Sequence, residues 1–167
     1  MSGLEWLEAA SYIVTIVGLP LAIGVYVYDR QRERQSDEEE IFLRLSDEYA
    51  DFMRLVIENA DLHLLSPVVK GTLSEDQLER KHALFAILVS LFERAYVLVY
   101  EENMGRQQAR LWQSWEDYMY EWCQRADFRA ALPALFQGED PGFVATIQRI
   151  AETTAGKTGR TGDAEGQ

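Results

Sequence analysis

Residues 9–28 read AASYIVTIVGLPLAIGVYVY, a run of twenty residues without a charged side chain. A helix of that length, rising about 1.5 Å per residue, matches the roughly 30 Å hydrocarbon core of a bilayer. Trp6 precedes the run, and Tyr26 and Tyr28 close it, where amphipathic rings suit the two headgroup layers. The run therefore predicts a single transmembrane helix.

The flanks of the run predict an uncleaved anchor and its orientation. Glu5 and Glu8 precede it, where a cleaved signal peptide would carry basic residues. The arginines Arg30, Arg32 and Arg34 follow it directly, on the side where basic residues meet the inner leaflet. The prediction is a single-pass protein of the cell inner membrane, with its N-terminus outside and its C-terminal domain in the cytoplasm.

Small or weakly polar side chains share one face of this predicted helix. Spacings of four, three and four residues bring together Ser11, Thr15, Gly18 and Ala22. Such a face can approach another helix closely or line a pore. Pro20 removes one backbone donor within the span and predicts a kink.

The rest of the chain predicts helices and no strands. Apolar residues recur at spacings of three and four over residues 37–65, 74–102 and 106–126. The pair Ser74 and Gln77 has the spacing of a capping box at the start of the second of these helices. The fold class predicted is all-α: an N-terminal transmembrane helix followed by a cytoplasmic helical bundle.

Two shorter helices complete the predicted bundle. Asp127 is the expected cap of the first, which Pro133 interrupts, and Asp140 followed by Pro141 begins the second. The domain boundaries that follow are 1–35 for the tail, span and basic flank, 36–155 for the bundle, and 156–167 for a glycine-rich disordered tail.

Aromatic side chains crowd the third long helix. The most prominent are Trp112, Trp115, Tyr118 and Trp122. Large amphipathic rings at helical spacing serve either as core or as a contact surface for a partner or a second copy. Exposed rings would identify an interface, and buried rings would identify the core.

Composition limits the partners and the chemistry. The chain has 167 residues, a formal net charge of -12 and 47% hydrophobic residues, so binding nucleic acid through a basic face is disfavoured and a real core is possible. Its single cysteine, Cys123, can form no internal disulfide and no cysteine-based zinc site.

The candidate catalytic and cofactor motifs are all incomplete. Glu79 and His82 form one Glu-x-x-His, whereas a di-iron bundle needs two and further glutamates. Residues 151–158, AETTAGKT, lack the first glycine of a phosphate-binding loop and do not follow a strand. Neither His63 nor His82 stands in the Arg-x4–6-His spacing of helical ribonucleases. We therefore predict no catalytic residues, no cofactor and no metal.

Two stretches follow the span and its arginine-rich exit: IFLRLSDEYADFMRLVIENADLHLL at 41–65 and LWQSWEDYMYEWCQRADFRAALP at 111–133. With them the chain resembles a set of uncharacterised bacterial membrane-anchored helical proteins, over most of residues 5–150. That resemblance implies a layout and no particular chemistry. In architecture the chain is also similar to the small membrane pore accessory of type VI CRISPR systems, which implies assembly as a ring.

The function expected from these features is that of a non-enzymatic, membrane-anchored interaction module that self-associates and binds a cytoplasmic protein. The alternative is an oligomeric membrane-perturbing or pore-forming effector in stress or phage defence. Membrane lipid is the expected partner of the span in both, and nucleic acid is expected in neither.

Overall fold

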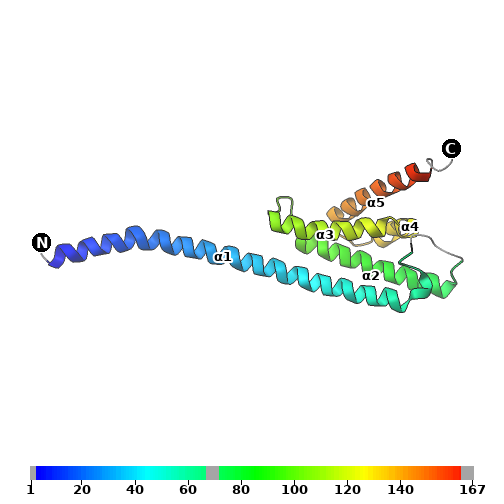
Figure 1. The fold of residues 1–167 in the computed structure, drawn as a ribbon, viewed down its shortest axis with the longest axis horizontal. Coiled ribbons are helices and arrows are strands. Elements are labelled where there is room, and N and C mark those ends of the chain that lie inside the picture. The colour runs from blue at the N-terminus through cyan, green and yellow to red at the C-terminus, as the bar shows by residue number, and fades with distance from the viewer. Residues whose placement is uncertain (1–2, 67–71, 163–167) are drawn as a thin grey trace. The chain divides into compact units, whose positions relative to one another are not determined.

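The computed structural model describes the backbone of residues 3–66 and 72–162, and the side chains of residues 21–30, 39–66 and 72–156. Within those residues the chain has five α-helices, one 3-10 helix and no strand, which confirms the all-α prediction. The chain divides into two compact units, Met1–Glu40 and Ile41–Gln167. Figure 1 shows the order of the helices.

The first helix, α1, runs over Gly3–Glu58 and ends earlier than predicted. The apolar pattern predicted a helix as far as residue 65. Instead, a 3-10 helix, η1 (Ala60–Leu62), follows Asn59, and His63 closes it with a left-handed φ of 50°. The tighter turn places Leu62 in the core, so the apolar pattern continues although the α-helix does not.

The second helix, α2 (Glu75–Val99), begins as predicted. Ser74 accepts a hydrogen bond from the Gln77 backbone N–H at 3.2 Å, and the Gln77 side chain accepts one from the Ser74 N–H at 2.9 Å. This capping box satisfies two backbone donors that a helix start leaves free. The helix ends at Val99 rather than at 102, because Tyr100 adopts an extended backbone.

Two helices follow a loop at residues 100–105. The first, α3, covers Arg106–Cys123, three residues shorter than predicted, and the second, α4, covers Ala126–Leu135. The cap of α4 is Arg125, so the prediction of an Asp127 cap is wrong and Asp127 lies in the first turn. Pro133 lies inside α4 near its end and does not interrupt it.

The last helix, α5, covers Pro141–Gly162. Asp140 caps it as predicted, because one carboxylate oxygen accepts hydrogen bonds from the Gly142 N–H at 2.8 Å and the Phe143 N–H at 3.0 Å. The predicted disordered tail begins at 156, whereas helical backbone continues to Gly162. Residues 163–167 lie outside the described residues.

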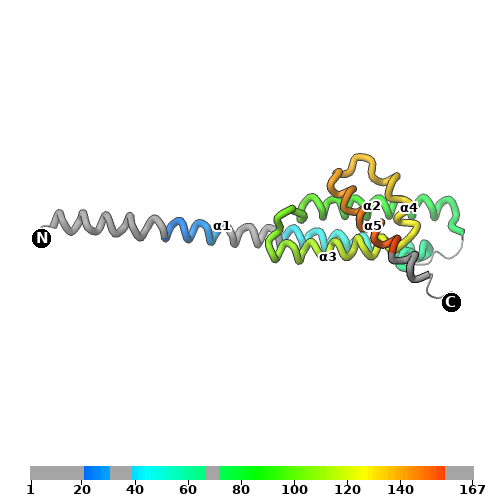
Figure 2. Tube along the Cα trace, turned by 90° about the horizontal axis from the view of Figure 1, so that it is seen from above, coloured from blue at the N-terminus to red at the C-terminus, as the bar shows by residue number. Residues whose placement is uncertain are grey.

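The second unit is built around one hydrophobic core. Residues 41–58 of α1 run beside α2, and α5 lies obliquely to α2 and α3 in both views (Figures 1 and 2). Every helix of this unit contributes buried side chains, among them Leu45, Phe52, Leu62, Leu88, Phe92, Trp115, Met119, Phe128, Phe143 and Ile147. The alternation of these apolar faces with charged ones is the pattern of an amphipathic helical bundle.

One helix within the described residues is long and apolar enough to cross a membrane, and it is α2, with a mean hydropathy of 1.7. The core accounts for part of this composition, because α2 packs against α3, α4 and α5 and 44% of its apolar window is buried. The sequence analysis predicts the membrane helix at residues 9–28 instead. The side chains of residues 9–20 lie outside the described residues, so that position stays a prediction.

Candidate functional site: a groove between α1 and α2

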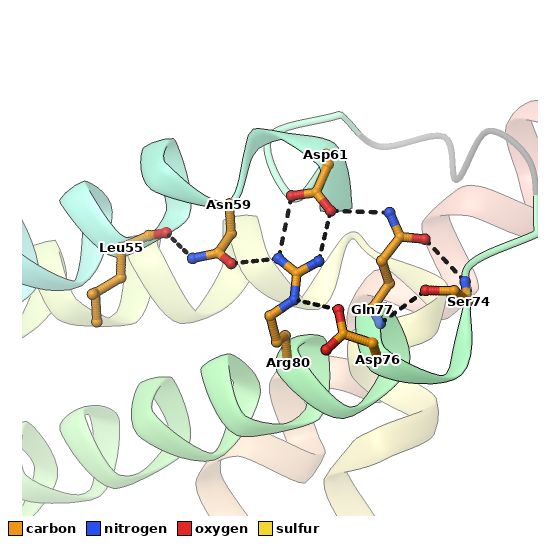
Figure 3. Close-up of polar contacts among 7 residues, drawn as sticks. All are labelled: Leu55, Asn59, Asp61, Ser74, Asp76, Gln77 and Arg80. Carbon is orange, nitrogen blue, oxygen red and sulfur yellow. Dashed lines mark hydrogen bonds and ion pairs between the residues drawn. The ribbon is translucent and has the colours of Figure 1, made fainter.

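A polar junction holds the end of α1 against the start of α2 (Figure 3). At its centre the Arg80 guanidinium donates to the Asp61 carboxylate, with the shorter contact at 2.8 Å, and to the Asp76 carboxylate at 3.0 Å. It also donates to the Asn59 side-chain carbonyl at 2.7 Å. Since Asn59 and Asp61 lie at the chain turn after α1, one side chain of α2 fixes that turn.

Two further bonds extend the junction. Gln77 donates to Asp61 at 2.9 Å, and the Asn59 amide donates to the Leu55 carbonyl at 2.9 Å (Figure 3). The hydrogen bonds from Arg80 and then from Gln77 lower the pKa of Asp61 to about 2, and the bond to Asp61 is the largest cause that raises the pKa of Arg80. Because these groups are exposed, we assign them a positioning role and little stabilisation.

A second polar tie joins the two helices further along. Arg94 of α2 forms an ion pair with Glu48 of α1, and Arg44 lies 4.0 Å from the same carboxylate. The order of the contacts, Arg80 with Asp61 and Arg94 with Glu48, shows that residues 41–58 and α2 run antiparallel. The two ties hold the helices side by side and leave a stretch between them that is lined mainly by apolar side chains.

A groove of about 500 Å³ occupies that stretch. Phe52 and Leu91 are buried beneath it, and Leu55 and Ile87 remain exposed on its α1 and α2 sides. Its lining also includes two small α2 residues, Ala86 and Ser90, which leave room for another helix to approach. An apolar groove between helices is the type of surface that receives an amphipathic helix.

The two walls of the groove carry opposite charges. Glu48 and Asp51 stand on the α1 wall, and Arg94 stands on the α2 wall. Arg54, on the same helix as Asp51, forms an exposed ion pair with it. The groove therefore combines an apolar floor with charged rims, of which Glu48 and Arg94 pair with each other, an arrangement that can dock a chain.

The structure places the predicted aromatic interface inside the core. Trp112, Trp115 and Trp122 are buried, so their crowding on α3 is explained by packing. Trp122 donates from its indole nitrogen to the Tyr49 hydroxyl at 3.1 Å. Tyr118 is 37% exposed and stacks on Tyr49 with ring centroids 4.3 Å apart. Of the four predicted interface residues, only Tyr118 offers surface to a partner.

The predicted membrane-face residues fall mostly outside the described side chains. Those of Ser11, Thr15, Gly18 and Pro20 are among them, as are those of Arg32 and Arg34. Ala22 and Arg30 are described, and both are exposed. The stripe and the kink therefore stay predictions.

The chemistry-bearing residues of the bundle are dispersed. Burial raises the pKa of the Cys123 thiol to about 12, which leaves it protonated and a poor nucleophile at neutral pH. His63 and His82 are exposed, on η1's end and on α2. Within the described ranges, no three histidine, cysteine, aspartate or glutamate side chains come together as metal ligands, and Glu79 and His82 gain no further partner of that kind.

Sequence reasoning missed the groove and its two polar ties. The partners in the ties are separated by 19 and 46 residues, a distance over which periodicity carries no information. The sequence contained one signal for the groove: Leu55 and Ile87 are large apolar residues next to the predicted core stripe. The spacing of three and four residues does not by itself say whether these side chains face the core or the surface.

Comparison of the chain with protein families, with curated proteins and with solved structures gives no match. The resemblance to bacterial membrane-anchored helical proteins stays a prediction.

Proposed function

We propose that the chain is a single-pass membrane protein whose helical bundle is a non-enzymatic interaction module. The observation that carries the membrane part is the exposure of the apolar side chains in residues 21–28. Those at Leu21, Ile23, Val25, Tyr26, Val27 and Tyr28 are between 47% and 67% exposed. Exposed apolar surface costs about 25 cal/mol per Å² in water, and lipid removes that cost.

The charge distribution supports the same arrangement. The uncharged run at 9–28 spans a bilayer, and Arg30 at its end suits anionic headgroups. The formal net charge of the chain is -12, so an anionic inner leaflet repels most of the bundle. The proposal is therefore an anchor with the bundle held in the cytoplasm and off the lipid surface.

The interaction part rests on the groove. An apolar floor, two exposed aliphatic rims and walls of opposite charge suit a helix of another protein or of a second copy. Binding of this kind needs shape and charge, and it requires no reactive group.

Alkaline carbonate extraction of membranes tests the anchor. The full-length protein should stay in the membrane pellet, whereas I13R combined with V17R should release it, because each arginine at a helix centre costs about 2.5–3.5 kcal/mol of insertion. The matched control is L43R, which changes an exposed leucine outside the run and should stay in the pellet. Release of the unaltered protein would refute the membrane proposal.

The small-residue stripe favours a second candidate function, an oligomeric membrane-perturbing effector. Ser11, Thr15, Gly18 and Ala22 would then face a pore. Leakage of a trapped dye from vesicles holding the protein would support this role, and G18L with A22L should abolish the leakage. Vesicles that retain the dye at high protein density would contradict the membrane-perturbing role.

A further inference from the structure

We draw no further inference here: the strongest candidate, the apolar groove between α1 and α2, has charged rims that already pair within the chain, Glu48 with Arg94 and Asp51 with Arg54, so nothing in the structure shows what covers it.

Discussion

Arg125 is a charged side chain enclosed by the bundle, with 4% of its surface exposed. It donates hydrogen bonds to the carbonyls of His63, Leu64 and Ser66, which follow η1, and it pairs with the Asp127 carboxylate at 2.8 Å. Burial raises the pKa of Asp127, but the bonds and charges of Arg125 and then Lys81 outweigh burial and lower it. The guanidinium therefore connects the chain after η1 to the start of α4.

Replacing Arg125 should destabilise the fold strongly. R125M leaves three carbonyls without their partner and leaves the Asp127 carboxylate with Lys81 as its remaining cation, at a cost of about 3–5 kcal/mol in the free energy of unfolding. The matched control is R149M, which removes the exposed pair with Glu116 and should cost less than about 1 kcal/mol. Chemical denaturation of the detergent-solubilised protein measures both, and equal losses would contradict the assigned role.

Glu139 gives the bundle a dependence on pH. Its hydrogen bond with Glu93, and then burial, raise the pKa of Glu139 from 4.5 to about 7, and Glu93 also accepts a bond from the Asp140 N–H. Between those pH values the folded protein holds a proton that the unfolded chain has lost, so stability falls as pH rises. The pKa of Asp61 is lowered from 3.8 to about 2, so the stability that its carboxylate contributes is lost as the pH falls through those values. That loss lies below the pH range in which Glu139 titrates.

E139Q should flatten the fall in stability between about pH 4.5 and 7, because the amide keeps a donor for Glu93 at every pH. E152Q, at an exposed glutamate of α5, is the control and should keep the slope. Thermal melting temperatures across this pH range measure the effect. If the melting temperature of E139Q still falls with pH as in the unaltered protein, another group causes the pH dependence.

Whether a contact between two residues could be predicted depends on how far apart the two residues lie in the sequence. The Ser74–Gln77 box and the Asp140 cap use partners within three residues, and both could be predicted. The hydrogen bonds from Arg125 to the carbonyls join residues about sixty positions apart, so no local sequence pattern predicts them.

At the scale of elements, the start of α5 depends on a close approach to α2. A Cβ atom built at Gly142 would lie 2.5 Å from the Tyr96 hydroxyl oxygen and 3.1 Å from an Asp140 carboxylate oxygen. The Tyr96 ring also stacks on Tyr100, with centroids 4.7 Å apart. Glycine at this position lets α5 begin directly against α2.

G142A should therefore cost about 1–3 kcal/mol in the free energy of unfolding, because tightly packed neighbours must move. Y96F removes the nearest atom and should recover part of the loss in the double variant. G156A, where a Cβ meets nothing within 4 Å, is the control and should stabilise α5 by up to about 1 kcal/mol. Equal effects at the two glycines would refute this steric explanation.

Element boundaries show what periodicity can and cannot predict. Apolar spacing located α2 and α3, because each has an amphipathic face over many turns, and the Ser74–Gln77 capping pair predicted the start of α2. It failed at the end of α1, where the 3-10 turn and the left-handed His63 keep apolar residues in the core without an α-helix. It also left open whether the aromatic rings of α3 face the core or a partner, which only the packing decides.

At the scale of the whole molecule, the chain has two long apolar segments, α2 and residues 9–28, and they differ in how much of their apolar surface is buried. In α2 one apolar face lies in the core of the bundle and Leu78, Ile87, Val97 and Leu98 are exposed, whereas in residues 21–28 of the 9–28 run every described side chain is exposed. Lipid is the solvent that suits an uncharged run of that length. The sequence predicts this layout from the uncharged run and its aromatic and basic flanks, whereas its one signal for the groove is the pair of large apolar residues Leu55 and Ile87.

The most direct test of the membrane proposal is labelling of single cysteines from the two sides of the membrane with an impermeant thiol reagent. The native Cys123 should contribute little background labelling, because burial raises its pKa to about 12 and keeps the thiol in its unreactive, protonated form. We predict that S2C is labelled from outside intact cells and that T72C, at an exposed position of the second unit, is labelled only after the membrane is opened. Labelling of both from the same side would show that the chain does not cross the membrane.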